Sequence, residues 1–187
     1  TCAIDAQRAL WCWGGAPHGL GDGVTPGSAT PVRIGTDADW SRISVGESHA
    51  CGLKTNGSLH CFGENGEGAL GVGDTADRAV FVPVDADLDW IDVSAGNLVT
   101  CARKSGNRAF CWGRNAENAV GDGTSTRRMR PVEIGTGLAW ASISTANGWS
   151  CGGTAGHDLY CWGDDTFGNL GDGTPGAPRT PAPARVG

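Results

Sequence analysis

The chain has little of what membrane spans, long helices and nucleic-acid binding require. No apolar run among its 187 residues approaches eighteen, and no stretch resembles a signal peptide, so we expect no membrane insertion. No periodic apolar segment is long enough for an ordinary helix. Acidic residues outnumber basic ones by 20 to 14, which gives a formal net charge of −6. This charge repels phosphate backbones, so nucleic acid is not an expected partner.

The sequence also lacks the spacing of a metal or catalytic site. It contains no C-x-x-C pair, and its four histidines occupy unrelated positions: His18, His49, His60 and His157. A zinc site needs closely spaced ligands, and a nucleophilic site needs a base that can be paired with it. We therefore predict no metal, no cofactor and no catalytic residue, and a protein that is not an enzyme.

Glycine is abundant instead, at 32 residues, and the chain repeats itself. The segment CGLKTNGSLHCFG, residues 51–63, returns at intervals of about fifty residues. Its cysteines are always ten residues apart, so a three-residue loop at the midpoint, with Gly able to take positive φ, places them opposite each other on a hairpin. The predicted disulfides close hairpins 2–12, 51–61, 101–111 and 151–161: Cys2–Cys12, Cys51–Cys61, Cys101–Cys111 and Cys151–Cys161.

Four disulfides of this kind indicate an oxidising compartment. Eight cysteines allow 105 pairings, and the repeat selects one of them. Such frameworks persist in secreted proteins and on cell surfaces. We therefore expect an extracellular or cell-surface location.

Each unit continues with the same further elements. An aromatic-Gly step is followed by a variable loop, at 15–19, 64–69, 114–119 or 164–169, and then by extended segments that open at Pro31, Pro83, Pro131 and Pro183. Apolar and polar residues alternate after Trp40, Trp90 and Trp140, which is typical of strands. Four short strands in about fifty residues form the blade of a β-propeller. We predict an all-β fold, with residues 1–187 as a single repeat domain of three complete units and one incomplete unit.

The repeat resembles that of the regulator of chromosome condensation family. The clearest matches are 44–49, 62–71 and 161–174, within a pattern of W-x-x-I-x-x-G, C-x-L and C-W-G-x-N-x-x-G-x-L-G-D-G-T. The resemblance covers nearly the whole chain and implies a β-propeller, usually of seven blades. The founding member is a nucleotide exchange factor on chromatin, and some bacterial members are secreted. The paired cysteines, the acidic balance and the absence of a basic tail differ from the nuclear type.

Three classes of function follow. The favoured one is an extracellular, non-enzymatic scaffold that binds a protein or further copies of itself through variable loops. The second is an exchange factor or chromatin binder like the founder. The third is a propeller enzyme with a site in the central channel, which would need clustered acids or histidines.

Candidate contact residues lie in the loops that vary between units. Trp149 is the strongest, because it falls outside the repeated tryptophan positions, in the column that holds His49 and Val99. Loops 47–49, 97–99 and 147–149 complete the expected surface with the variable loops above. The candidate contacts are Trp149, His49, Glu64, Arg114, Asp164 and Phe167. The repeated tryptophans, by contrast, are expected to pack between blades.

Some remaining motifs have structural interpretations. Asp22, Asp122 and Asp172 each supply one carboxylate to a Gly-Asp-Gly turn, so we expect turn caps and not calcium ligands. Residues 127–130 form the only basic run and are expected to be a solvated loop. Asn56-Gly57-Ser58 is a glycosylation sequon at a hairpin tip.

The ends of the chain leave one blade short of a strand. No tryptophan strand precedes Cys2 or follows the last proline segment. We therefore expect the missing strand to come from outside these residues, and favour part of a larger propeller over a closed four-blade ring.

Overall fold

The structure is a computed structural model that describes residues 1–15, 18–174 and 180–187. The described residues form four antiparallel sheets that follow one another along the chain. Blade 1 contains β1 (Cys2–Ile4), β2 (Leu10–Gly15) and β3 (Gly27–Arg33). Blade 2 contains β4 (Trp40–Val45), β5 (His49–Lys54), β6 (Leu59–Gly63) and β7 (Arg78–Pro83). Blade 3 contains β8 (Trp90–Ala95), β9 (Val99–Lys104), β10 (Arg108–Gly113) and β11 (Arg128–Ile134). Blade 4 contains β12 (Trp140–Thr145), β13 (Trp149–Thr154), β14 (Leu159–Gly163) and β15 (Thr180–Arg185).

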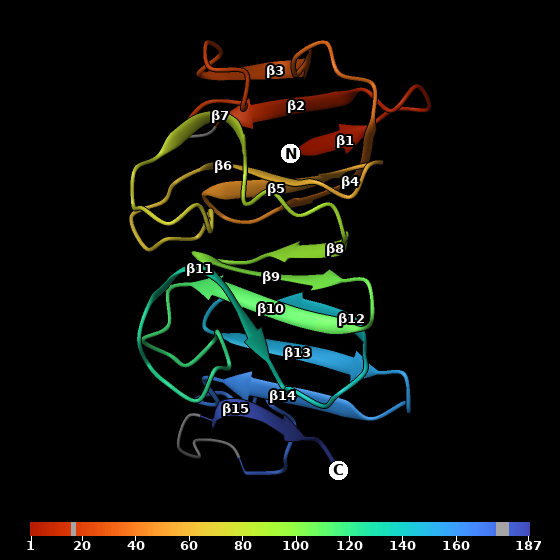
Figure 1. The fold of residues 1–187 in the computed structure, drawn as a ribbon. Coiled ribbons are helices and arrows are strands. Elements are labelled where there is room, and N and C mark those ends of the chain that lie inside the picture. The colour runs from red at the N-terminus through yellow and green to blue at the C-terminus, as the bar shows by residue number, and fades with distance from the viewer. Residues whose placement is uncertain (16–17, 175–179) are drawn as a thin grey trace.

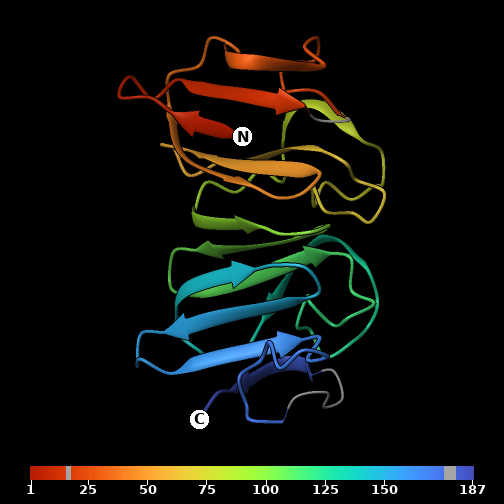
Figure 2. The same cartoon turned by 180° about the vertical axis from the view of Figure 1, so that it is seen from behind.

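The predicted all-β propeller fold is confirmed, with three four-stranded blades and one of three strands. The tryptophan strands β4, β8 and β12 are the inner strands, and each contacts the preceding blade. Figures 1 and 2 show the blades stacked in chain order. The N-terminus lies at blade 1 and the C-terminus at blade 4, at opposite ends of the array (Figure 1). The described blades thus form an open array with two end faces.

The hairpins have the predicted register. Cysteines pair directly across each hairpin, with Cα atoms 4.1 Å apart and all four disulfides formed. The residue after the midpoint has positive φ in every hairpin: it is Gly57 in one and Arg8, Asn107 or His157 in the others, whereas of the midpoints themselves only Gly106 has positive φ. This is the position that a three-residue loop places in the left-handed region. Glycine at the midpoint is therefore not the requirement that the sequence suggested.

The sequence prediction places the starts of the outer strands too late in the chain. The outer strands β3, β7, β11 and β15 begin three to five residues before Pro31, Pro83, Pro131 and Pro183. These strands lie at the outer edge of each sheet, where a residue whose N–H side faces solvent can be proline. Proline therefore does not mark the start of the strand.

The repeated tryptophans pack between blades, as predicted. The indole N–H of Trp112 donates to the carbonyl of Ala69 in blade 2 at 2.8 Å, and that of Trp162 donates to Ala119 in blade 3 at 2.9 Å. Both rings are fully buried. Trp13 occupies the same position in blade 1 but is only partly buried, because no blade lies before it among the described residues. These contacts make each blade part of its neighbour's core.

Blades 2 and 3 each contain an equivalent ionic cluster beside the inner-strand tryptophan. The Lys54 ammonium lies 2.5 Å from Asp37 and 5.3 Å from the Trp40 ring centroid. In blade 3, Lys104 contacts Asp87 and Asp89 in the same way and lies over Trp90. In blade 4 the corresponding residues are Thr154, Gly137 and Ala139, so lysine and both aspartates are replaced together.

Candidate functional site

The variable loops gather on one side of the array, which we call the loop face. In each complete blade, the loop after the inner strand and the loop after the second hairpin strand lie side by side. The amide of Glu64 donates to Ser48 at 2.9 Å, that of Arg114 to Leu98 at 2.8 Å, and that of Asp164 to Gly148 at 2.9 Å. The large loops lie together on the left in Figure 1, with the hairpin tips on the opposite side. Consecutive blades therefore present paired loops in one direction.

A buried side chain holds each large loop from inside. The Oδ1 atom of Asn115 accepts from Val120 N at 3.0 Å, while its Nδ2 donates to the carbonyls of Thr124 and Thr126. Asn65 makes the same kind of contacts in blade 2, and Asp165 takes this position in blade 4. Loops 64–69, 114–119 and 164–169 are thus partly core, whereas the sequence suggested contact surface alone.

The aspartates of the Gly-Asp-Gly turns cap those turns, as expected. Asp22 Oδ1 accepts from the amides of Val24 and Thr25, and Asp172 Oδ1 accepts from Thr174 N at 2.8 Å. At Asp122 burial opposes ionisation, but hydrogen bonds from Thr124 and Arg128 outweigh it and hold the carboxyl pKa below its usual value. Arg128 is the first residue of β11 and holds the preceding turn through Asp122, so residues 128–130 of the basic run are strand and not the solvated loop that the sequence suggested.

The column of His49, Val99 and Trp149 lies between blades and not in loops. His49 is 3% exposed, and its Nε2 lies 2.7 Å from Thr100 Oγ1 in the next blade. Each of the three residues is the first residue of a strand, and Val99 is buried in the core shared with blade 4. His49 is therefore an interface residue between blades 2 and 3, and not the exposed loop residue that the sequence suggested. Trp149 is half-buried because no fifth blade covers it among the described residues.

The other candidate contacts differ in how accessible they are. Phe167 is 85% exposed at the tip of its loop. Arg114 is partly buried and pairs with Glu117 at 2.6 Å, whereas Asp164 accepts from the Thr166 hydroxyl at 2.7 Å. Glu64 is also partly buried. Phe167 is thus the candidate most open to a partner, although the sequence ranked Trp149 first.

Sequence reasoning missed the serines that join the inner strands. Ser44 Oγ accepts from the amide of Ala95 at 2.9 Å, and Ser94 Oγ accepts from the amide of Thr145 at 3.1 Å. The signal in the sequence that could have indicated this role is the recurrence of serine at 44, 94 and 144. Ser44 and Ser94 thus each satisfy a backbone donor of the following blade.

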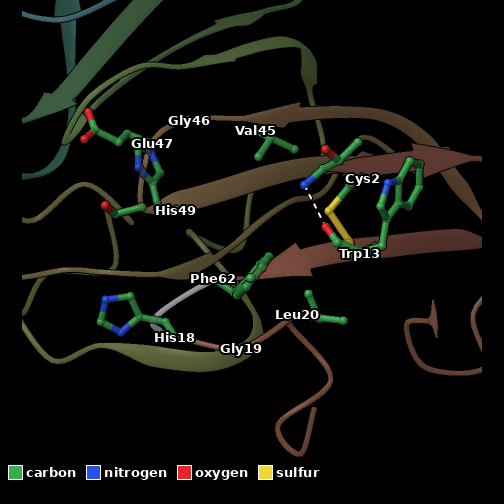
Figure 3. Close-up of a pocket in the computed structure, with 14 residues that line it drawn as sticks. Cys2, Trp13, His18, Gly19, Leu20, Val45, Gly46, Glu47, His49 and Phe62 are labelled. Carbon is green, nitrogen blue, oxygen red and sulfur yellow. Dashed lines mark hydrogen bonds between the residues drawn. A yellow bond between two sulfur atoms is a disulfide. The ribbon is translucent and has the colours of Figure 1, made fainter. Parts of the chain in front are cut away.

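A small cavity of about 60 Å³ lies between blades 1 and 2. Figure 3 shows residues of both blades around it, including Trp13, Leu20, Phe62 and His49. Burial lowers the pKa of His49 to about 4, so its imidazole is neutral near pH 7. His18, also in the wall, lies 3.4 Å from Asp77. The wall is largely apolar, so it suits packing better than proton transfer.

Metal-ligating side chains do not cluster in the part of the chain that the structure describes. No group of three His, Cys, Asp or Glu side chains is close enough there to hold an ion. Within the same residues, no helix is long and apolar enough to cross a membrane. The sequon asparagine, Asn56, is exposed, and its Oδ1 accepts from Ser58 N and Ser58 Oγ.

Models of the regulator of chromosome condensation (RCC1) repeat match residues 40–69 and 90–118, and a second model of that repeat matches 56–103. Human WBSCR16 has a similar structure, with a TM-score of 0.87 and 17% identity, over 100% of this chain and 50% of that one. Prp20p from Saccharomyces cerevisiae, described with its binding to Gsp1p and histones, has a TM-score of 0.86 and 19% identity, over 100% and 48%. For the same yeast RCC1 protein bound to Kap60, the TM-score is 0.85 and the identity 18%, over 99% of this chain and 47% of that one.

Among curated proteins, none matches the chain in sequence. The chain spans about half the length of the structures that it resembles. At such identities the likeness establishes the fold alone.

Proposed function

Because the chain carries repeats of the regulator of chromosome condensation type on a propeller fold, we propose that it is an extracellular, non-enzymatic scaffold that binds protein partners. The observation that carries this proposal is the loop face, where paired loops of successive blades are held by Asn65, Asn115 and Asp165. Rigid elements that present variable loops suit recognition of another protein. Prp20p, which shares the fold, is described with protein partners.

The disulfides support an extracellular location over an exchange factor in a reducing compartment. All eight cysteines are paired within their own hairpins. Thiol-reducing systems would keep such cysteines reduced in the cytosol or nucleus. Alkylation of cysteines in intact cells, followed by peptide mapping, tests this: protected, paired cysteines are expected, and free thiols would contradict the location.

A photo-crosslinking amino acid placed on each side of the array tests the binding face. Gly66 is exposed on the loop face, whereas Ser105 is exposed at a hairpin tip on the opposite side. In the producing cells, adducts with another protein are expected from position 66 and not from position 105. Equal adducts from both positions, or adducts from 105 alone, would contradict the assignment of the loop face.

A further inference from the structure

In blades 2 and 3, the amide group that holds the large loop donates into a group of oxygen atoms. Asn115 Nδ2 lies 2.8 Å from the carbonyl of Thr124 and 3.3 Å from Asp122 Oδ1. In blade 2, Asn65 Nδ2 donates in the same way to the carbonyl and the carboxylate of Asp74, at 2.9 and 3.2 Å. Each of these turns therefore offers carbonyl and carboxylate oxygens to a donor from its loop.

Blade 4 has a carboxylate where blades 2 and 3 have this amide. Asp165 Oδ1 accepts from the amide of Leu170 at 2.9 Å, which is the bond that orients Asn115 in blade 3. The turn of blade 4 keeps its form too, because Asp172 Oδ1 accepts from the amide and the hydroxyl of Thr174. The other oxygen, Asp165 Oδ2, therefore takes the place of the amide nitrogen and faces the oxygens of Asp172 and Thr174.

The burial of Asp165 makes this arrangement of oxygens unfavourable in the chain alone. Its side chain is 1% exposed, and Oδ2 is buried without a hydrogen-bond partner in the part of the chain that the structure describes. A buried carboxylate is destabilising unless a positive charge or hydrogen-bond donors compensate it. The position of Asp165 Oδ2 thus calls for a cation.

The turn of blade 4 also differs in the residue that neutralises its aspartate. Arg78 pairs with Asp74 at 2.6 Å in blade 2, and Arg128 pairs with Asp122 at 2.5 Å in blade 3. Each arginine is the first residue of an outer strand and is paired with the last glycine of the strand before it. Thr180 occupies this register position in blade 4. Blade 4 therefore has one more negative charge in its loop and one positive charge fewer at this position.

We propose that blade 4 binds a calcium ion between the carboxylates of Asp165 and Asp172. These carboxylates and the carbonyl of Thr174 are hard oxygen ligands, and water completes the roughly six to eight oxygens that calcium takes. The two positive charges of the ion equal the difference in charge between this loop and the loops of blades 2 and 3. The turn supplies one carboxylate, as the sequence indicated, and the buried loop residue supplies the second.

The site lies within one blade and needs no neighbouring blade. Asp165, Asp172 and Thr174 all belong to the connection between β14 and β15. Asp74, which has the role of Asp172 in blade 2, is exposed although another blade follows it. Solvent and ions can therefore reach this side of the turn. The inference goes beyond the proposed function, because it concerns how loop 164–169 is held and not what the loop face binds.

Thermal unfolding of the oxidised chain in EDTA and in calcium tests the inference. Extracellular modules bind calcium with a Kd of roughly 0.1–1 mM, and we expect an affinity in this range. About 10 mM calcium should then raise the melting temperature by at least about 3 °C relative to EDTA. Calorimetric titration with calcium chloride should give one site for each chain.

Two variants that copy blade 3 should remove the effect of calcium. Asp165→Asn, which reproduces Asn115, should abolish the rise in melting temperature. In EDTA this variant should melt no lower than the wild type, because the amide can donate to the Thr174 carbonyl. Thr180→Arg, which reproduces Arg128, should weaken calcium binding at least about tenfold, because a guanidinium then neutralises Asp172.

Asp158→Asn is the matched control, because it removes the same charge from the same blade at the hairpin turn. Asp158 pairs with Arg185 at 2.7 Å, so this variant should respond to calcium like the wild type. A wild type that does not respond to calcium, an Asp165→Asn variant that responds fully, or an Asp158→Asn variant that does not respond would overturn the inference. If Asp165→Asn fails to fold by circular dichroism, Thr180→Arg decides. Crosslinking from Gly66, in blade 2, tests the loop face independently.

Discussion

At the scale of single residues, His49 shows how burial creates a pH dependence. The Thr100 hydroxyl donates to Ala69, so it accepts from His49 Nε2, whereas Nδ1 is buried and has no hydrogen-bond partner in the part of the chain that the structure describes. Burial lowers the folded pKa of His49 to about 4, against about 6.5 in an unfolded chain. Between these values the unfolded state binds more protons, so the free energy of unfolding rises with pH.

Above about pH 6.5, protonation of His49 should not affect the free energy of unfolding. As the pH decreases from there toward 4, His49 should lower the free energy of unfolding by about 3 kcal/mol. Urea unfolding at a series of pH values measures this slope. His49→Val, which copies Val99 of the next blade, should flatten it. Some slope should remain, because burial and then Lys54 also lower the pKa of His60. An unchanged slope in the variant would show that His49 does not titrate in this way.

The lysine clusters offer a second test at this scale. Lys104→Thr should destabilise the protein by about 1–3 kcal/mol, because Asp87 and Asp89 lose their partner beside Trp90. Adding Asp87→Gly and Asp89→Ala reproduces the residues of blade 4 and should recover much of that loss. Thermal unfolding of the single and triple variants measures the coupling. A triple variant that is less stable than the single variant would contradict a stabilising coupling between Lys104 and the two aspartates.

At the scale of elements, the stapled hairpin is the unit of stability. Replacing Cys101 and Cys111 together by alanine should lower the free energy of unfolding by about 2–3 kcal/mol, because the short closed loop no longer restricts the unfolded chain. Denaturant unfolding of the variant measures the loss. Peptide mapping under non-reducing conditions should show links within each hairpin, and links between different repeats would contradict the hairpin pairing.

The large loops allow an exchange test between blades. Asp165→Asn should stabilise the protein by about 1 kcal/mol, because Asp165 Oδ2 is buried without a hydrogen bond among the described residues, and an amide there can donate to Thr174 as Asn115 does to Thr124. The reciprocal change, Asn115→Asp, should destabilise it, because it removes the donor to the Thr124 and Thr126 carbonyls. Melting temperatures that move in the same direction for both variants would contradict this account of the loops.

At the scale of the whole molecule, the blades should differ in how readily they open. The interface of blades 1 and 2 has no indole or hydroxyl donor at Phe62 and Ala50, and blade 1 has three strands. In a repeat array, stability is approximately a sum of blade and interface contributions. Amide hydrogen exchange should therefore be faster in β1 and β2 than in the equivalent strands β13 and β14 of blade 4. Faster exchange in β13 and β14 would mean that the hydrogen bonds from Trp162 and Ser150 to the Ala119 carbonyl add little to the stability of the blade interface.

Most of the fold could be predicted from the local spacing of residues in the sequence. Strand alternation, the period of about fifty residues and the ten-residue cysteine offset are properties of short segments, so they predicted the blades, the hairpin register and the disulfides. The predicted starts of the outer strands were wrong by a few residues, because an outer strand can contain proline at the edge of a sheet.

The candidate site depended on contacts that short segments do not contain. Whether His49, Val99 or Trp149 is covered is decided by the following blade, about fifty residues away. Asn115 is buried because residues 120–126 fold back over it, and Phe167 is exposed because no charged partner or further blade meets it among the described residues. Repetition in the sequence thus determined the blade, whereas the packing of one blade on another decided which repeated positions became core and which remained open to a partner.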